Sequence, residues 1–210
     1  MKRSLVIGKT NVGKTLFCVH FAHFMGLQEL RWLIERSDGR TEQRRMSVGE
    51  AERTLSDPIA HRTRDLQSIN LSFARGKGDR QLLLTDTTGL TDGVNPDLDL
   101  REAMAKTLEA LLSSSLVLHI VDAYEIARFG QDLKSSGPLL GAWNELDEQL
   151  ARLGAKKPGY MVLANKVDLP GAKDGYRRLK ERLSGQTVLP ISALHGTGFR
   201  EVKKHVWKLV

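Results

Sequence analysis

The stretch Gly8–Thr15 reads G-K-T-N-V-G-K-T and fills every position of the phosphate-loop pattern G-x-x-x-x-G-K-[ST]. The apolar run Ser4–Ile7 precedes it, and the composition of Leu16–Met25 behind it predicts a helix. In a strand–loop–helix unit the backbone N–H groups of the loop converge on phosphate oxygens at the helix N-terminus, where the helix dipole also favours negative charge. The chain is therefore expected to bind a nucleoside triphosphate.

The loop gives separate roles to its side chains. Lys14 is expected to reach the β- and γ-phosphates, and the Thr15 hydroxyl is expected to ligate Mg²⁺. The other nucleotide contacts expected from this stretch come from Gly8, Asn11, Val12, Gly13 and Leu16.

Composition limits the class of protein. The chain has 210 residues, of which 40% are hydrophobic and 27% charged, as in an ordinary globular domain, and we expect one domain over residues 1–210. No apolar run is long enough to span a membrane, and the start of the chain does not read as a secretion signal. The single cysteine, Cys18, excludes an internal disulfide, is expected to be a core residue, and fits a reducing cytoplasm.

The charge balance is basic. Lys and Arg number 32 and Asp and Glu 25, which gives a net charge of +7. Such a balance suits a polyanionic partner such as RNA or an acidic membrane surface. Much of the excess is spread over solvated helix faces such as 173–182, and no known nucleic-acid module is recognisable.

A second motif predicts which base is bound. Asn165-Lys166-Val167-Asp168 follows the apolar strand Tyr160–Ala164. The Asp168 carboxylate can accept hydrogen bonds from guanine N1–H and the exocyclic amino group, a donor pair that adenine lacks. Asn165 is expected to brace the phosphate loop, and the stem of Lys166 to cover the base.

Two further segments extend the site. Ser192-Ala193-Leu194 follows the expected strand Thr187–Ile191, and in G domains the backbone N–H at this alanine bonds guanine O6. The strand around Leu82–Leu84 ends in the D-x-x-G segment Asp86–Gly89. Asp86 is expected to hold Mg²⁺ and the Gly89 N–H to sense the γ-phosphate, because glycine allows the backbone to approach closely and to move.

A threonine that closes over Mg²⁺ and the γ-phosphate completes such a site. Thr63, just ahead of the expected strand Ser68–Arg75, is the favoured candidate, and Thr54 is the weaker one. Thr63 follows Lys14 at a greater distance than a minimal G domain needs, which indicates an insertion at approximately residues 27–57.

The insertion has its own pattern. Leu30–Arg36 and Arg40–Met46 flank the turn signal Ser37-Asp38-Gly39 and predict a β-hairpin at the sheet edge, followed by a short helix to Leu55 that Ser47 and Glu50 cap. Four arginines lie beside Trp32: Arg36, Arg40, Arg44 and Arg45. They indicate either a basic partner-binding platform, which we favour slightly, or an edge strand protected by charge.

The rest of the chain alternates strands and helices. Expected are a helix at Asp97–Leu112, a buried strand at Leu116–Asp122, a looser stretch at Glu125–Leu140, and helices at Ala142–Leu153 and Phe199–Val210. His119 is expected to be a packed core residue. The predicted fold is α/β, a three-layer α/β/α phosphate-loop G domain with a mostly parallel sheet and an inserted β-hairpin plus short helix before switch I.

These motifs, in this order, make the chain resemble small GTPases of the translation-factor-related class, and within it the group that holds Era and the tRNA-modification GTPase TrmE. That group usually reads N-x-G-K-S, T-T-R-D and D-T-A-G-L. The chain departs from it at Thr15, Arg62 and Thr88. The resemblance implies a Mg²⁺-dependent switch that hydrolyses GTP to GDP and phosphate.

The resemblance also bears on catalysis. Ras-like proteins place a water-orienting glutamine directly after the D-x-x-G glycine, where this chain has Leu90. In several relatives an asparagine at the position of Asn11 helps bind K⁺ against the phosphates. The expected catalytic group is therefore Lys14, Thr63, Gly89 and Asn11, with K⁺ stimulation; the alternative is that Asn11 is only a turn residue. Asp92 and Glu102 are both open as groups that position water.

Several functions remain open at this point. The favoured one is a stand-alone cytoplasmic GTPase linked to ribosome or RNA assembly. The others are a switch that binds a protein effector through the hairpin, a nucleotide-dependent homodimer with very slow hydrolysis, and, least favoured, an ATP-using kinase.

Overall fold

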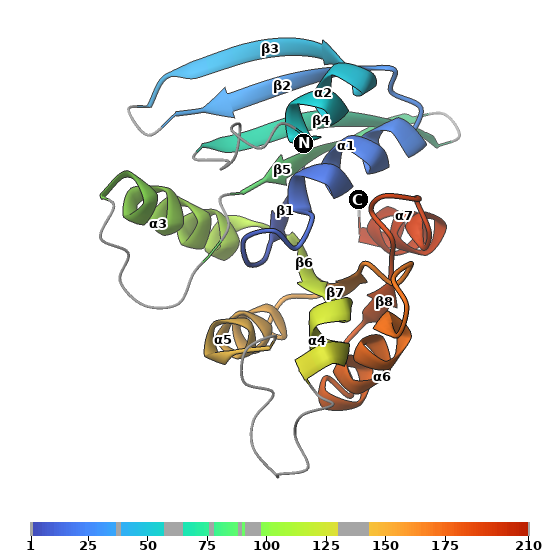
Figure 1. Cartoon of the computed structure of the whole chain (residues 1–210). Coiled ribbons are helices and arrows are strands. Elements are labelled where there is room, and N and C mark those ends of the chain that lie inside the picture. The colour runs from blue at the N-terminus through green and yellow to red at the C-terminus, as the bar shows by residue number, and fades with distance from the viewer. Residues whose placement is uncertain are drawn as a thin grey trace.

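The computed structural model describes residues 2–36, 39–56, 65–75, 78–87, 90, 98–129 and 143–209. Within these ranges the strands form one eight-stranded sheet in the order β3-β2-β4-β5-β1-β6-β7-β8, with helices on both faces (Figure 1). The strands are β1 (Lys2–Ile7), β2 (Glu29–Glu35), β3 (Thr41–Ser47), β4 (Leu66–Arg75), β5 (Gly78–Asp86), β6 (Leu116–Asp122), β7 (Gly159–Asn165) and β8 (Val188–Pro190). The helices are α1 (Lys14–Phe24), α2 (Val48–Ser56), α3 (Leu98–Ser113), α4 (Ala123–Phe129), α5 (Glu145–Gly154), α6 (Ala172–Arg182) and α7 (Phe199–Leu209).

The sheet is mostly parallel, as the alternating pattern predicts. Strands β5, β1, β6, β7 and β8 pair in parallel, whereas β3, β2 and β4 add to β5 in antiparallel fashion. Strands β6 and β7 are buried along their whole length, as is typical of central parallel strands covered on both sides.

Each face of the sheet has its own core. Buried residues of α1, α2 and α7 pack on one face, and those of α3, α4, α5 and α6 pack on the other. His119, Cys18 and the apolar residues around them are fully buried, so the expected core roles of both residues are confirmed. Burial raises the pKa of the Cys18 thiol well above its usual value. Within the described residues, no helix combines the length and the apolar character that a membrane span requires.

The inserted hairpin and short helix are present. Strands β2 and β3 pair in antiparallel register and form the outer edge of the sheet (Figure 1), although Ser37 and Asp38 of the turn lie outside the described residues. Helix α2 follows, and its first turn has the predicted capping box: the Ser47 N–H donates to Glu50 Oε2 at 2.7 Å, and the Glu50 N–H donates to Ser47 Oγ at 3.2 Å. The hydrogen bonds that the Ser47 N–H and hydroxyl donate to the Glu50 carboxylate lower the pKa of Glu50.

The partner-binding platform that we favoured stays a prediction, and its four arginines do not all lie on one face of the hairpin. Arg44 lies opposite Trp32 and Arg45 lies opposite Arg31, so the two neighbouring arginines are on opposite faces. Trp32 is 4% exposed and packs into the core, and Arg36 pairs with Glu42. Strand β3 is exposed except at Met46, which is half-buried. This geometry favours the alternative, an edge strand protected by charge.

Two further expectations need correction. Part of the looser stretch expected from Glu125 is helix α4, because Asp122 Oδ1 accepts hydrogen bonds from the N–H groups of Tyr124 and Glu125 and so caps a helix; residues 130–142 lie outside the described residues. Helix α5 begins at Glu145 and not at Ala142, because Asn144 is its N-cap and shares a capping box with Asp147.

Candidate nucleotide-binding site

The predicted motifs converge at one edge of the sheet. The phosphate loop follows β1, Asp86 is the last residue of β5, and Asn165 is the last residue of β7. Because these strands run in parallel, their carboxyl ends meet at the same edge, where ligands bind in open α/β sheets.

The backbone of the phosphate loop needs its glycines. Gly8 has φ +144° and Gly13 has φ +95°, conformations that side chains rarely adopt. A Cβ on Gly8 would lie 2.3 Å from the carbonyl oxygen of Ile120, and one on Gly13 would lie 2.5 Å from Asn165 Nδ2. Asn11 is also left-handed, with φ +63°. The loop therefore lies close against β6 and β7, in a backbone conformation that a side chain at Gly8 or Gly13 would disturb.

Lys14 lies within the loop that it is expected to serve. Its Nζ donates to the carbonyl oxygen of Lys9 at 2.8 Å, and the side chain is buried. Burial lowers the pKa of Lys14 because the ammonium loses water, although the nearby Asp86 carboxylate acts in the opposite direction. A buried ammonium at this place has an electrostatic reason to attract an anionic phosphate group.

Thr15 and Asp86, the two expected Mg²⁺ ligands that the structure describes, are in contact with each other. Thr15 Oγ1 donates to Asp86 Oδ2 at 2.7 Å, and Asp86 is fully buried. A hydroxyl and a carboxylate oxygen side by side match the hard oxygen ligands that Mg²⁺ prefers, with phosphates and water completing its shell. The residues therefore fit this ion. Thr63, the third expected ligand, lies outside the described residues, as does Gly89.

The base side of the site is joined to the phosphate loop by Asn165. Its Nδ2 donates to the Val12 carbonyl oxygen at 2.8 Å, the bracing contact expected from the sequence. Its Oδ1 accepts from the Ala193 N–H at 2.8 Å. The amide expected to reach guanine O6 is thus hydrogen-bonded to Asn165 here, and its contact with the base stays a prediction.

The neighbouring residues of the N-K-x-D loop have defined positions. Lys166 has φ +66°, and its Nζ lies 2.5 Å from Asp122 Oδ2. This ion pair fixes the direction of the side chain expected to cover the base. Asp168, the expected guanine ligand, lies 3.9 Å from His195 Nε2, and Leu194 of the S-A-L segment is 57% exposed.

Leu90, which stands where Ras-like proteins have a glutamine, is a core residue. Its side chain is 1% exposed, and its N–H donates to the Gly8 carbonyl oxygen at 3.2 Å. Leu90 itself is therefore anchored to the phosphate loop, and its side chain has no group that could orient a water molecule. Of the two carboxylates considered for that role, Glu102 is exposed on α3 and Asp92 lies outside the described residues.

The model of one protein family matches residues 3–166, and its description is 50S ribosome-binding GTPase. The chain belongs to this GTPase family. The family expected from the motifs is thereby confirmed.

Curated relatives of the chain are named GTPase Obg. The chain is 31% identical over 141 residues to GTPase Obg of Syntrophomonas wolfei, covering 67% of this chain, and 32% identical over 142 residues to GTPase Obg of Alkaliphilus oremlandii, covering 66%. In both cases the match spans 31% of the relative's own length.

Solved structures confirm the fold of the GTPase. Era from Aquifex aeolicus bound to GDP·AlF4⁻ superposes with a TM-score of 0.61 at 16% identity, covering 100% of this chain and 57% of that one. The G domain of the Thermotoga maritima FeoB iron transporter gives 0.54 at 18% identity, covering 100% and 98%. The predicted α/β G-domain fold is therefore confirmed.

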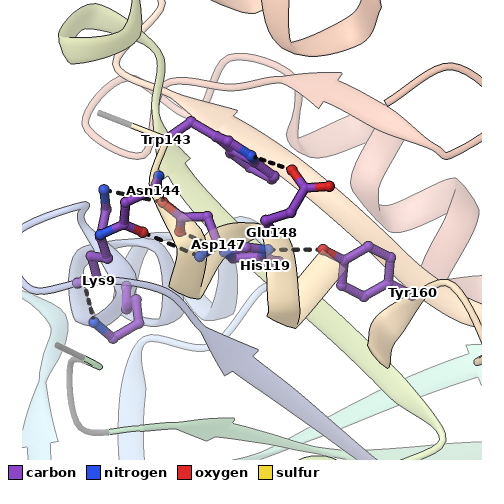
Figure 2. Close-up of polar contacts among 8 residues, drawn as sticks. Lys9, His119, Trp143, Asn144, Asp147, Glu148 and Tyr160 are labelled. Atoms are coloured by element: carbon purple, nitrogen blue, oxygen red, sulfur yellow. Dashed lines mark hydrogen bonds and ion pairs between the residues drawn. The ribbon is translucent and has the colours of Figure 1, made fainter. Parts of the chain in front are cut away.

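Sequence reasoning missed one polar network of this GTPase (Figure 2). Asp147 belongs to α5. Its Oδ2 atom is 3.1 Å from Lys9 Nζ, and its Oδ1 atom is 3.3 Å from His119 Nε2. The other ring nitrogen of His119 lies 2.8 Å from the Tyr160 hydroxyl. Burial raises the pKa of Asp147, but the hydrogen bond and charge of His119 and the contact with Lys9 outweigh it and leave the pKa below its usual value.

The network connects the phosphate loop to the helix layer. Lys9 is the second residue of the loop, and its carbonyl oxygen also accepts from Lys14. His119 and Asp147 are fully buried, so both need these partners. These residues lie far apart in the sequence, so their pairing could not be predicted from it. A lysine inside a phosphate loop and a histidine inside a buried strand are nonetheless each a signal of a buried partner.

Proposed function

We propose that this domain is a molecular switch that binds GTP with Mg²⁺ and hydrolyses it to GDP and phosphate. The observation that carries the proposal is the side-chain amide of Asn165, which joins the phosphate loop at Val12 to the S-A-L segment at Ala193. Phosphate recognition and base recognition are thus parts of one site. The family match over residues 3–166 supports the same activity.

The residues present can stabilise phosphoryl transfer by position and charge. The loop N–H groups and the Lys14 ammonium would act on oxygens that gain negative charge in the transition state. Bound Mg²⁺, held through Thr15 and Asp86, would neutralise phosphate charge. The Gly89 N–H and the Thr63 hydroxyl are proposed to report the γ-phosphate and to be released on hydrolysis.

We further propose that K⁺ stimulates the reaction with Asn11 as one of its ligands. Two observations support this: Leu90 is buried and cannot place a water molecule, and Asn11 is exposed on the loop in a left-handed conformation. A cation next to the phosphates would add its positive charge to that of Lys14.

Guanine specificity is tested by exchanging the base-reading carboxylate. Asp168→Asn should weaken GTP binding and favour XTP, since an amide offers a donor to the xanthine oxygen where guanine has an amino group. Fluorescent mant-nucleotide titrations would measure both affinities. Asp174→Asn on α6, also a removal of one carboxylate, is the control. Retained GTP preference in Asp168→Asn, or binding of ATP by the wild type, would contradict the proposal.

The K⁺ proposal is tested by phosphate release in KCl and in NaCl at equal ionic strength. The wild-type rate should be higher in KCl, and Asn11→Ala should reduce the two rates to the same low value. Equal wild-type rates in the two salts would reject a role for K⁺. The absence of turnover in either salt would reject hydrolysis and leave a nucleotide-binding module.

For the partner, we propose a ribosomal or other RNA-containing particle in the cytoplasm. The family description, the structure of an Era relative with nucleotides 1506–1542 of 16S ribosomal RNA, and the net charge of +7 support this class. The protein in its GTP state should co-sediment with ribosomal particles, and less so as salt increases. Absence of co-sedimentation at low salt would contradict a ribosomal or RNA-containing partner. Size-exclusion chromatography with GDP and with GDP–AlFx would then show whether the protein forms a nucleotide-dependent homodimer instead.

A further inference from the structure

Helix α7 carries a row of cations on its solvent side. Arg200, Lys204 and Lys208 are exposed and are spaced by four residues, so they follow one another along the helix surface. We call these three residues the α7 ridge. A rise of 1.5 Å per residue separates successive members by about 6 Å along the axis. Successive phosphates of a nucleic-acid strand are a similar distance apart.

The charge of the ridge is not neutralised within the part of the chain that the structure describes. No carboxylate there lies within 4.0 Å of a ridge cation, and Glu201 is the only acidic residue of α7. Helix α6 differs in part, because two of its cations, Arg177 and Arg182, pair with Asp174 and Glu148.

Aromatic rings border the ridge. Lys203 Nζ lies 4.4 Å from the ring centroid of Trp207 and 5.8 Å from that of Phe24, which α1 contributes. Phe24 is 44% exposed, and Trp207 is half-buried. Lys203 and Trp207 lie three positions after Arg200 and Lys204, the spacing at which helix residues are surface neighbours, so the rings and the row of cations form one continuous surface over α1 and α7.

We propose that this surface binds single-stranded RNA, with the α7 ridge on the phosphates and with Phe24 and Trp207 beside the bases. Aromatic faces next to a row of cations are how proteins hold unpaired strands. A lipid surface fits less well, because three of the apolar residues of α7, Phe199, Val202 and Val206, are at most 1% exposed and cannot enter acyl chains. The inference rests on the RNA partner of the proposed function and names its site.

The test measures binding of a fluorescein-labelled single-stranded oligouridylate by anisotropy at increasing salt, with the full chain loaded with a non-hydrolysable GTP analogue, the state in which the RNA partner is proposed to bind. The triple variant Arg200→Gln, Lys204→Gln, Lys208→Gln should bind more weakly, and the slope of log K against log salt should fall by about 2, since each phosphate contact contributes about 0.7. Phe24→Leu keeps an apolar side chain but removes the ring, and should weaken binding while leaving the slope unchanged.

The matched control removes the same charge from the opposite face of the sheet, in Lys156→Gln, Lys173→Gln, Lys180→Gln, and should keep the wild-type slope. Unchanged affinity for mant-GDP would show that each variant is folded. RNA binding with a wild-type slope in the ridge variant would overturn this site alone. A wild type that binds no RNA would reject the RNA partner as well, and tighter binding to phosphatidylserine vesicles or to polyglutamate than to RNA would overturn the class of ligand.

Discussion

The side-chain Nδ2 of Asn165 donates a hydrogen bond to the carbonyl oxygen of Val12 at 2.8 Å, joining two residues 153 positions apart. The same side chain accepts from the Ala193 N–H through Oδ1. Asn165 is 2% exposed, so these partners replace water for both ends of the amide. The position of the phosphate loop and the position of the base-reading segment are therefore set by one residue.

The first prediction concerns Asn165→Ala. The substitution leaves two buried backbone groups without their partner, and each such loss costs about 1–3 kcal/mol. Urea unfolding should show a free energy of unfolding lower by about 2 kcal/mol. Titration with mant-GDP should show affinity reduced at least about tenfold, the equivalent of 1.4 kcal/mol. Asn70→Ala, at an exposed position of β4, is the control. Wild-type affinity in Asn165→Ala would contradict the bracing role.

A second prediction follows from the contact between Lys9 and Asp147. Asp147→Asn keeps the shape of the side chain but removes the charge that Lys9 and His119 share, which should lower the free energy of unfolding at neutral pH by about 2 kcal/mol. Because Asp147 contacts the phosphate loop through Lys9, affinity for GDP should fall as well. Asp174→Asn, whose carboxylate pairs with Arg177 at the surface, should have little effect.

The difference in unfolding free energy between the wild type and Asp147→Asn should depend on pH, in a direction set by the pKa of Asp147. The pKa of Asp147 in the folded protein lies below the unfolded value of 3.8, so the folded state binds fewer protons between these two values. The stability that Asp147 contributes is fully present above the unfolded value and is lost as the pH falls through the folded one. The gap between wild type and Asp147→Asn should thus be constant near neutral pH and shrink below about pH 4. A gap that grows on acidification would contradict this assignment.

The sequence predicted the elements that local pattern determines. The strands before the phosphate loop and before Asn165 are short apolar runs with glycine or polar residues directly after them, so their carboxyl ends, and with them the site, could be located. The network of Lys9, His119 and Asp147 could not be found in this way, because each pairing depends on which helix packs on which strand. The start of α4 was missed although Asp122 is a recognisable N-cap.

The hairpin arginines are a different case, since the faces that they occupy could be deduced from the sequence. Arg44 and Arg45 are consecutive residues of a predicted strand, and side chains alternate between faces along a strand. The prediction of a strand therefore already implied that Arg44 and Arg45 lie on opposite faces. The register of β2 and β3 places Arg45 opposite Arg31, and like charges directly opposite each other disfavour close pairing of their side chains.

The third prediction uses the buried ammonium of Lys14. Saturating GDP and Mg²⁺, at about 100 times the dissociation constant, should stabilise the wild type by about 2.7 kcal/mol. For a domain of this size the midpoint of thermal unfolding should rise by about 5–10 °C. Lys14→Met should fold, since it relieves the burial of a charge, but should lose most of this shift. Lys173→Met, at an exposed position of α6, should keep it. A full shift in Lys14→Met would contradict a phosphate role for the lysine.

The last prediction concerns the packing of α4 on α6. A Cβ on Gly175 would lie 1.9 Å from the Ala123 carbonyl oxygen and 2.9 Å from the Ala127 nitrogen, so Gly175→Ala must push α4 away. We expect the free energy of unfolding to fall by about 1–3 kcal/mol. Affinity for GDP should also fall, because Asp122 both caps α4 and pairs with Lys166 of the N-K-x-D loop.

The matched control for this prediction is Gly49→Ala in α2, where nothing lies within 4 Å of the added Cβ. This substitution should stabilise the protein by as much as about 1 kcal/mol, because alanine has the higher helix propensity, and should leave GDP affinity unchanged. Urea unfolding and mant-GDP titration measure both quantities for both variants. If Gly175→Ala destabilises the fold but binds GDP as the wild type does, α4 is a packing element only, and Lys166 does not depend on its position.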